Sequence, residues 1–353
     1  MSAVLSLNSG SSSLKFALFG KEKVLCRDLV EGKAIEPVFA RVETAAQGMP
    51  IRAVGHRLVY QGPSRKEHTV VTAALIDEME RHLGQTALHL PRQLAILKAA
   101  QKRFPDAVHV ACFDSAFYTN TPRIAHLLPL PEHVTGELSR CGFHGLACEA
   151  IVNRLNGCQG NWICLHLGSG SSVIALQEGQ PIEMTMGFSP LSGVMMGTRS
   201  GDLDPGVILY LILEKGYSAA QIEHLLTYES GLLGVSTMTA DMKELLVKQK
   251  HAPRAQEAID LFCHHLIKAI GSFIPLLGGL DGIVFTGGIG FGSPEIRRAL
   301  CSKLAYFEVV LDDEQNKRSA FLISAKTSRV TLHTFEVNEE RVIADHARAL
   351  SGV

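Results

Sequence analysis

The sequence has no excess of charge of either sign and no basic block. Its 34 Lys and Arg residues nearly balance its 35 Asp and Glu residues, which leaves a formal net charge of −1. Proteins that bind nucleic acid usually present a clustered basic face or tail. We therefore expect no nucleic-acid partner.

The sequence also has no C-x-x-C pair, although it contains eight cysteines. Most of these lie in apolar runs, which is typical of buried free thiols in a reducing compartment. The longest apolar stretch, residues 269–292, is broken by Pro275, Asp281 and several glycines, so we expect no membrane span. Residues 2–9 begin a strand at once, without the basic and apolar regions of a signal peptide. Together these absences predict a cytoplasmic protein with no membrane partner.

The length and composition predict two globular domains. A chain of 353 residues with 46% hydrophobic and 20% charged residues can bury a sizeable core. Within it, the apolar spacing predicts a long helix over 253–277. Residues 21–50 give little signal and are interpreted as sheet edge and loop, and short strands are expected near 307–311 and 329–335.

The first turn of the chain joins two predicted strands through small polar residues. Asn8-Ser9-Gly10-Ser11-Ser12-Ser13 follows Val4–Leu7 and precedes Leu14–Leu18. Because Gly tolerates positive φ and Asn and Ser favour turns, we expect a β-hairpin. Its N–H groups and hydroxyls, with Lys15 beside them, suit phosphate oxygens, but an ordinary surface turn would look the same. It is not a G-x-x-x-x-G-K-[ST] loop.

A second turn of the same kind lies about half a chain later. Gly168-Ser169-Gly170-Ser171-Ser172 separates two further predicted strands. This internal similarity indicates duplicated domains, whose hairpins could hold a polyphosphate from both sides of a cleft. A third turn, Thr286-Gly287-Gly288-Ile289-Gly290, follows a buried strand at 283–285, and a helix is predicted after Ser293-Pro294. A helix N-terminus behind such a turn suits an anion or a nucleotide.

Several charged residues fall at predicted strand ends or in a loop. Arg57 ends a strand and is either an anion clamp or a surface arginine. Asp114 follows the buried strand 108–113, where open α/β sheets bind ligands, although an acid there can also cap a helix. Arg199 is the one cation of a long glycine-rich stretch, 186–206, and loops of that length are usually functional.

Two further polar residues have plain structural interpretations. His144 precedes a predicted helix over 146–155, and a lone histidine is more often structural than catalytic. Asn338 caps a predicted C-terminal helix, so Glu339 in its first turn could simply compensate the helix dipole.

Taken together, these stretches resemble the acetate kinase family, the acetate and propionate kinases of the actin–sugar kinase–Hsp70 superfamily. The motifs that carry the resemblance run in the family's order along the chain: L-N-S-G-S-S-S-L-K (7–15), V-G-H-R (54–57), F-D-S-A-F (113–117), G-F-H-G (142–145), H-L-G-S-G-S-S (166–172), M-G-F-S-P-L-S-G (186–193), M-G-T-R-S-G-D-L-D-P (196–205), T-G-G-I-G (286–290) and N-E-E (338–340). The resemblance implies an α/β protein of two duplicated ribonuclease-H-like (actin-like ATPase) domains with an interdomain cleft. The N-terminal domain would comprise residues 1–118 plus 340–353, and the C-terminal nucleotide-binding domain residues 119–339.

The resemblance also implies a reaction. A short-chain acyl kinase transfers the γ-phosphoryl group of ATP reversibly to acetate or propionate, giving acyl phosphate and ADP, with Mg²⁺ (or Mn²⁺) and as a homodimer. Arg57 and Arg199 would clamp the carboxylate and the transferring phosphoryl group. His144 would donate to an equatorial oxygen, and Asp114 would position an arginine and the metal-bound waters. Phosphoryl transfer needs such alignment and charge neutralisation more than covalent help.

The same resemblance implies the binding residues. Asn8 and Glu339 match the residues near the metal, which prefers oxygen ligands. The small apolar pocket for the acyl group would be lined by Val59, Leu88, Phe143 and Pro190. The nucleotide and its phosphates would contact Ser11, Ser13, Lys15, His166, Gly168, Ser169, Gly170, Asp241, Met242, Lys243, Gly288, Ile289 and Gly290.

The chain departs from the family pattern mainly on the nucleotide side. Ser169 stands where Asn is usual, and Phe291 and Gly292 stand where Glu-Asn is usual. Lys243 replaces an arginine that lies on the base, and Lys is a poor substitute for a stacked guanidinium. ADP/ATP remains favoured as the nucleotide, with another nucleotide or pyrophosphate as the alternative phosphoryl partner.

Two other functions compete with this interpretation. A kinase of the same superfamily could act on a sugar or a longer acid, but a sugar would be bound by carboxylates and amides rather than by Arg57 and Arg199. A regulatory module could bind nucleotide without catalysis. The joint presence of Asn8, Arg57, Asp114, His144, Arg199 and Glu339 speaks against that module.

Overall fold

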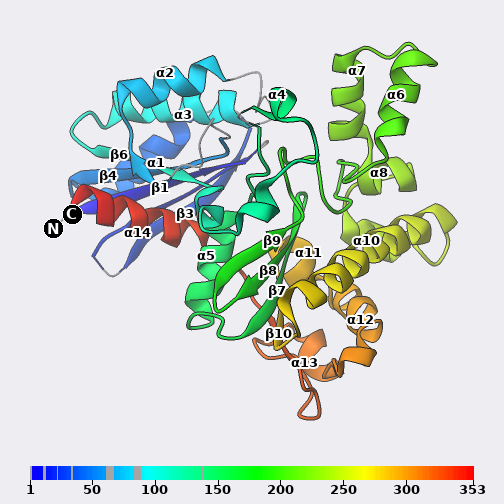
Figure 1. Cartoon of the computed structure of the whole chain (residues 1–353). Helices are drawn as coiled ribbons and strands as arrows, with labels where there is room; N and C mark the ends of the chain where they lie inside the picture. Colours follow the sequence, from blue (N-terminus) through cyan, green and yellow to red (C-terminus); the bar gives the residue numbers. More distant parts are fainter. Residues whose placement is uncertain are drawn as a thin grey trace. The chain divides into compact units, whose positions relative to one another are not determined.

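The computed structural model describes residues 2–10, 13–21, 23–32, 35–60, 67–82, 89–136 and 138–353 (Figure 1). The chain divides into two compact units. Unit 1 comprises Met1–Thr119, Phe143–Asn153 and Asn338–Val353, and unit 2 comprises Asn120–Gly142 and Arg154–Val337. The boundaries expected from the sequence place Phe143–Asn153 in the second domain, whereas its contacts group this segment with unit 1.

Unit 1 is built on a mixed six-stranded sheet. Its strands are β1 (Ala3–Ser9), β2 (Ser13–Phe19), β3 (Val24–Glu31), β4 (Ile51–Leu58), β5 (Thr69–Val70) and β6 (Val108–Phe113). They lie in the order β3-β2-β1-β4-β6-β5. The hairpins β1–β2 and β2–β3 are antiparallel, whereas β4 runs parallel to β1 and β6 parallel to β4. The carboxyl ends of β1, β4 and β6 therefore share one edge of the sheet.

Unit 2 repeats this topology on a five-stranded sheet. Its strands are β7 (Asn161–Leu167), β8 (Ser171–Gln177), β9 (Gln180–Met184), β10 (Gly282–Thr286) and β11 (Thr331–Thr334). They lie in the order β11-β10-β7-β8-β9, with the same antiparallel hairpins and parallel neighbours as in unit 1. The prediction of two duplicated α/β domains is confirmed by this repetition.

Helices cover both faces of the first sheet, which explains why every residue of β1 is buried. The helices of unit 1 are α1 (Glu36–Ala46), α2 (Ala73–Arg81), α3 (Leu90–Arg103), α5 (Gly145–Arg154) and α14 (Glu339–Ser351), with a 3₁₀ turn at Ala116–Tyr118. Successive side chains of a strand point to opposite faces. Leu5 and Leu7 accordingly pack with α1 and α3, whereas Val4 packs with α5 and α14. Figure 1 shows α14, in red, lying along the blue strands.

Unit 2 has a larger helical complement. Its helices are α4 (Glu132–Thr135), α6 (Pro205–Leu213), α7 (Ala219–His224), α8 (Gly231–Ser236), α9 (Met242–Lys248), α10 (Pro253–Leu277), α11 (Gly287–Gly292), α12 (Pro294–Ser302) and α13 (Asp313–Lys317), with 3₁₀ turns at Arg123–His126 and Ala305–Phe307 and a π turn at Leu225–Glu229. The long helix α10 was predicted over the same residues. In the described chain it is the one helix that length and composition would allow to cross a membrane. Its apolar face, including Phe262, Leu266 and Ile270, packs in the core of unit 2 against the sheet.

The structure corrects three local predictions. Residues 21–50 are not only sheet edge and loop, because they contain β3 and α1, whose apolar face buries Val38, Phe39 and Val42. Residues 307–311 form no strand and end in a single bridge, Leu311 to Ser324. The third glycine turn is the short helix α11 rather than an irregular turn. The last two of these segments are too short for sequence spacing to determine, because their few residues sample too little of a period.

Candidate active site

Four predicted site residues form one hydrogen-bonded cluster in unit 1. Asn8 lies near the end of β1, Arg57 near the end of β4, and Asp114 directly after β6. The three strands are mutually parallel, so their carboxyl ends bring these side chains to one edge, where open α/β sheets bind ligands. Glu339 joins them from the first turn of α14.

Arg57 and Asp114 form the ion pair at the centre of the cluster. Arg57 Nη2 and Nε donate to Asp114 Oδ2 at 2.5 and 3.1 Å, and Arg57 Nη1 donates to Asn8 Oδ1 at 3.1 Å. Burial lowers the pKa of Arg57, but the charges of Asp114, Glu339 and Glu340 outweigh burial and raise it above its ordinary value. The guanidinium is therefore a permanent cation with a fixed orientation.

Asn8 ties the two acids of α14 to the strand edge. Its Nδ2 donates to Glu339 Oε2 at 2.6 Å and to Glu340 Oε1 at 2.9 Å. Glu340 is 2% exposed, and Arg27 Nη2 donates to its Oε2 at 3.0 Å. The sequence analysis singled out Glu339 and missed both Glu340 and Arg27. The signal for Glu340 was the second acid of N-E-E, but a helix turn alone does not show which acid faces the sheet.

Asp114 has one oxygen free for a further partner. Its side chain is 1% exposed, and within the described residues Oδ1 is buried and receives no hydrogen bond. A buried carboxylate oxygen without a donor is costly, since such atoms are almost always satisfied. Among the described residues, this acceptor of Asp114 is therefore left unsatisfied by the chain itself.

His144 is held beside Asp114 by an unusually close backbone contact. Gly145 N donates to Asp114 O at 2.9 Å, and a Cβ on Gly145 would lie 2.1 Å from that oxygen, so only glycine fits. His144 itself has a φ of 59°, a conformation in which histidine is enriched relative to most residues. The predicted catalytic histidine thus lies directly before α5, where the start of this helix meets the end of β6.

The predicted acyl pocket is only partly described. Val59 follows β4, is buried, and donates its backbone N–H to Gln93 Oε1 at 2.8 Å. Phe143 is also buried, and its carbonyl accepts from Tyr118 Oη at 2.7 Å. Both belong to unit 1, whereas Pro190 belongs to unit 2. Leu88 lies outside the described residues, as does Ser11 of the first hairpin.

The described residues on either side of the first turn pair as an antiparallel hairpin. Gly10 N donates to Ser13 O at 2.9 Å, and Lys15 pairs across the hairpin with Asn8. The Lys15 side chain is exposed. Ser13 and Lys15 therefore lie at the same edge of the sheet as the cluster.

In unit 2 the second and third glycine segments meet. Gly168 N donates to Gly170 O at 3.0 Å in the β7–β8 turn, and His166 Nδ1 lies 3.1 Å from Thr286 Oγ1 at the end of β10. Gly287 has a φ of +79°, and a Cβ there would lie 2.4 Å from Leu167 O. Only glycine lets α11 begin this close to β7.

Arg297 of α12 hydrogen-bonds to the backbone of the α11 segment. It is fully buried, and its Nη1 donates to Gly290 O at 2.8 Å and to Phe291 O at 2.5 Å, while Nε donates to Asn316 Oδ1 at 2.6 Å. Burial lowers its pKa to about 10, so the group remains a cation at neutral pH. Arg297 and Asn316 were not found from the sequence, because neither lies in a recognisable motif.

The remaining nucleotide-side predictions fall at the start of α9. Asp241 caps this helix, since its Oδ1 accepts from Lys243 N at 2.7 Å and Glu244 N at 3.1 Å. Met242 is 3% exposed and belongs to the core. The Lys243 side chain is exposed, and a Cβ on Gly292 would lie 3.9 Å from its Cε, so α9 and α11 present their residues side by side.

Arg199 lies in a loop that is tightly fixed although it has no regular structure. Its Nη1 donates to Pro190 O at 2.8 Å, and its carbonyl accepts from Met196 N at 3.1 Å. The start of α8 packs against this loop, and a Cβ on Gly231 would lie 2.3 Å from Met196 O. The prediction of a long loop over 186–206 is confirmed as far as residue 204, where no helix or strand is formed, and α6 begins at Pro205.

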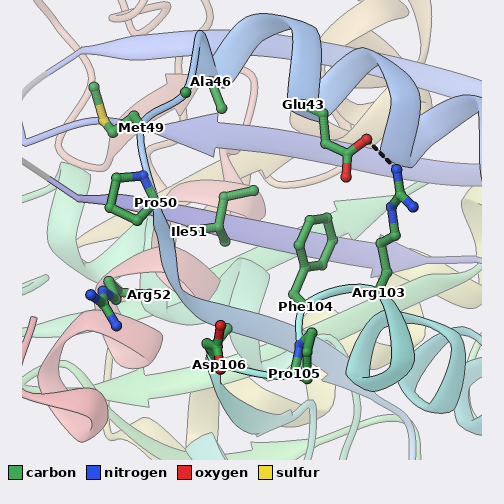
Figure 2. Close-up of a pocket in the computed structure, with 12 residues that line it drawn as sticks. Glu43, Ala46, Met49, Pro50, Ile51, Arg52, Arg103, Phe104, Pro105 and Asp106 are labelled. Atoms are coloured by element: carbon green, nitrogen blue, oxygen red, sulfur yellow. Dashed lines mark hydrogen bonds and ion pairs between the residues drawn. The ribbon is translucent and has the colours of Figure 1, made fainter.

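A pocket elsewhere in unit 1 does not belong to this cluster. Figure 2 shows it near the amino ends of β4 and β6, where Ile51 and Phe104 line a volume of about 370 Å³ and Glu43 forms an ion pair with Arg103. Arg57 and Asp114 lie at the opposite, carboxyl ends of the same strands. Among the described residues that line this pocket, none is a predicted site residue.

Comparisons with known proteins agree with this architecture. The sequence matches the model of the Acetokinase family over residues 32–345. The acetate kinase of Rhodopseudomonas palustris (strain TIE-1) is 37% identical over 392 residues, which covers 99% of this chain and 98% of that protein. Propionate kinase PduW of Salmonella typhimurium (strain LT2) is 34% identical, with 97% of this chain and 95% of that protein covered.

Solved structures show the same likeness in three dimensions. A propionate kinase from Francisella tularensis superimposes with a TM-score of 0.90 at 31% identity, covering 99% of this chain and all of that one. An acetate kinase from Porphyromonas gingivalis gives a TM-score of 0.87 at 29% identity over 99% of this chain and all of that one. Since the family match covers most of the sequence, the chain belongs to the acetokinase family.

Proposed function

We propose that this protein is a short-chain acyl kinase. It transfers the γ-phosphoryl group of ATP reversibly to acetate or propionate and releases ADP. The observation that carries the proposal is the cluster of Asn8, Arg57, Asp114 and Glu339 at one sheet edge, in a chain whose relatives are named acetate kinase and propionate kinase. These residue types suit phosphoryl transfer, because they supply charge and alignment rather than a covalent nucleophile.

The reaction needs no general base from the protein. A carboxylate oxygen of the substrate attacks the γ-phosphorus, and the bond between that phosphorus and the β-γ bridging oxygen breaks with ADP as the leaving group. Arg57 and Arg199 hold the carboxylate and the transferring group, and His144 donates to an equatorial oxygen. Each stabilises charge that the three equatorial oxygens carry in the transition state. Asp114 fixes the orientation of Arg57 through its two hydrogen bonds.

The residues of the cluster fit a magnesium ion. Asp114 Oδ1 is a buried oxygen without a donor among the described residues, and Glu339 is linked to Asp114 through Asn8 and Arg57. Mg²⁺ keeps several waters and uses few protein oxygens, so water bridges to these groups are the expected mode. When bound, the ion would neutralise phosphate charge, and Mn²⁺ has the same ligand preference.

The nucleotide binds, in this proposal, to residues of both units. Ser11, Ser13 and Lys15 serve the phosphates from the first hairpin, and His166 with Gly168–Gly170 from the second. The segments Asp241–Lys243 and Gly288–Gly290 serve the rest of the nucleotide. Met242 would contact the nucleotide through its backbone alone, since its side chain is in the core of unit 2.

A second candidate is the same reaction with another phosphoryl partner. Lys243 lies near Gly292, and neither Phe291 nor Gly292 has a polar side chain to offer to a base. This pairing favours a partner that makes fewer base contacts, such as pyrophosphate or a different nucleotide.

The acyl chain is short in this proposal because the predicted pocket is small and apolar. Val59, Leu88, Phe143 and Pro190 would line it. Each methylene contributes only about 1–3 kcal/mol to discrimination, so acetate and propionate are both expected substrates.

A second copy of this chain is the proposed macromolecular partner. None of the nine residues of α6 is buried, although seven of them are Val, Ile, Leu or Tyr. Leu213 is 74% exposed and Leu209 56%. An apolar patch of this kind marks an interaction surface, and homodimerisation through α6 would cover it. We place the enzyme in the cytoplasm, in keeping with its eight free cysteines.

A hydroxamate assay tests the proposal directly. Acetate, ATP, Mg²⁺ and hydroxylamine are incubated with the protein, with propionate, GTP and pyrophosphate in parallel. We expect acyl hydroxamate with acetate or propionate and ATP. Product with pyrophosphate or GTP but not ATP would favour the second candidate. Absence of product with every partner, while the protein still binds nucleotide, would refute the kinase function and favour a regulatory module.

A further inference from the structure

Glu149 of α5 lies between two histidines at a place that no predicted site residue occupies. His68 Nε2 is 3.1 Å from Glu149 Oε1, and His346 Nε2 is 2.5 Å from Glu149 Oε2. The two imidazole rings are 3.9 Å apart between centroids. Burial raises the pKa of Glu149, but the hydrogen bonds from His346 and His68 outweigh it and lower the pKa to about 2. The carboxylate is therefore ionised and fully engaged.

The tautomer of His68 decides what this cluster can do. The backbone N–H of Phe113 donates to His68 Nδ1 at 3.1 Å, so Nδ1 carries no proton and Nε2 must carry one. That Nε2–H donates to Glu149. Three ligand atoms within 4.8 Å of one another would otherwise suit a transition metal such as Zn²⁺, but a protonated Nε2 has no lone pair to offer. The geometry therefore points to a hydrogen-bonded network rather than a metal site.

Each member of the network belongs to, or is hydrogen-bonded to, a segment that carries a proposed catalytic or metal-binding group. His68 binds the amide of Phe113, the residue before Asp114. Glu149 is five residues beyond His144, in the helix that this histidine begins. His346 is on α14, two helical turns beyond Glu339.

The network adds a second set of hydrogen bonds between the segments that carry the cluster. At the sheet edge, Gly145 N binds Asp114 O at 2.9 Å, and Asn8 binds Glu339 at 2.6 Å. These bonds tie α5 and α14 separately to the strands. Glu149 ties the two helices to each other through His346, and ties them to β6 through His68. The relative placement of the two helix starts therefore depends on this carboxylate.

We propose that Glu149 is a positioning residue: by binding His68 and His346 it sets the placement of Asp114, His144 and Glu339 for phosphoryl transfer. This inference rests on the proposed acyl kinase function. Misplacement of a reacting or stabilising group by about 1 Å can cost about 100-fold in rate. Loss of the network should therefore lower kcat, with smaller changes in the KM values, because the residues that bind the substrates remain.

Two substitutions at Glu149 separate positioning from simple stability. In Glu149→Gln, the amide oxygen can accept from His68 Nε2–H and the amide nitrogen can donate to neutral His346, so the network persists. In Glu149→Leu both bonds are lost. We expect kcat of Glu149→Gln within about threefold of wild type and kcat of Glu149→Leu about 10- to 100-fold lower, with both KM values within about twofold. Glu43→Leu, which removes the Arg103 ion pair on the surface of the same unit, is the matched control and should keep wild-type kcat.

A second variant guards against a misfolded Glu149→Leu protein. His346 is 31% exposed, so His346→Leu should fold and still cut the link to α14, with a loss of kcat in the same direction. Wild-type kcat in either Leu variant, or an equal loss in Glu149→Gln, would overturn the inference. Stoichiometric Zn²⁺ binding by calorimetry that disappears in Glu149→Leu would overturn it in favour of a metal site. An inactive wild-type protein would instead refute the acyl kinase function itself.

Discussion

Arg199 and Arg57 are fixed by different kinds of partner. Arg57 is oriented by a carboxylate, Asp114, whereas Arg199 Nη1 donates to a backbone carbonyl, Pro190 O, within its own loop. Substituting Arg57 would leave Asp114 buried without its cation, which confounds catalysis with stability. Arg199 is therefore the better residue for testing the transition-state role.

Replacing Arg199 with Ala should lower kcat/KM by about 100- to 1,000-fold, because it removes a donor to charge that develops in the transition state. Steady-state kinetics with acetate and ATP measure the effect, with far-UV circular dichroism as the check on folding. Arg199→Lys is the matched control, since it keeps the charge but loses the two parallel N–H donors of the guanidinium. Its kcat/KM should lie between those of the wild type and Arg199→Ala. A rate like that of the wild type in Arg199→Ala would remove Arg199 from the mechanism.

At the scale of elements, strands were easier to predict than the side chains that complete the site. The strand before Asp114 was predicted at 108–113, which is the observed extent of β6. Parallel strands then place Arg57 and Asp114 at one edge by topology alone. Glu340 and Glu149 could not be found this way, because their partners Asn8, His68 and His346 are remote in sequence. Such contacts depend on how helices dock, which local spacing does not encode.

The exposed apolar side chains of α6 predict that charges on this helix would disrupt a dimer. A Leu209→Glu, Leu213→Glu double variant should convert a dimer to a monomer, because two charges would have to be buried in an apolar interface. Multi-angle light scattering over a dilution series measures the change. Val247→Glu introduces the same charge on α9 at a side chain that is 77% exposed, and should leave the oligomeric state unchanged. A wild-type protein that is monomeric at all concentrations would show that α6 does not pair copies of this chain.

Across the whole molecule, the two units use the same sheet for different purposes. The central parallel pair of each sheet, β1 with β4 and β7 with β10, is joined by a side-chain contact. The contact is Arg57 to Asn8 in unit 1 and His166 to Thr286 in unit 2. In unit 1 the carboxyl ends of the parallel strands carry Asn8, Arg57 and Asp114. In unit 2, Gly168 and Gly287 follow β7 and β10. The two units therefore share one sheet topology and differ in the residues at their strand ends. Unit 1 has the hydrogen-bonded cluster, and unit 2 has the glycine segments that suit phosphates.

The stability of the fold should depend on pH through a buried histidine pair in unit 1. His56 Nε2 lies 2.9 Å from His109 Nδ1, and His109 Nε2 lies 3.2 Å from Phe104 O. A carbonyl only accepts, so His109 Nε2 carries the proton and its Nδ1 accepts from His56. Burial lowers the pKa of His56, with a further contribution from His109, and burial also lowers the pKa of His109. Both rings are therefore neutral in the folded state.

These lowered pKa values fix the sign of the effect. Below pH 6.5 the unfolded chain binds protons at both histidines while the folded chain does not, so the free energy of unfolding falls as the pH falls. The loss between pH 6.5 and 5.5 should be larger for His56, whose pKa is lowered well below its ordinary value, than for His109. The lowered pKa of Glu149, about 2, adds a further loss only below about pH 4.5.

Urea unfolding followed by circular dichroism at pH 8, 6.5 and 5.5 measures the loss that the two histidines cause. His109→Gln keeps a donor to Phe104 O but cannot titrate, so its midpoint should fall less steeply between pH 6.5 and 5.5. Equal slopes for the variant and the wild type would mean that His109 takes up its proton in the folded state as well.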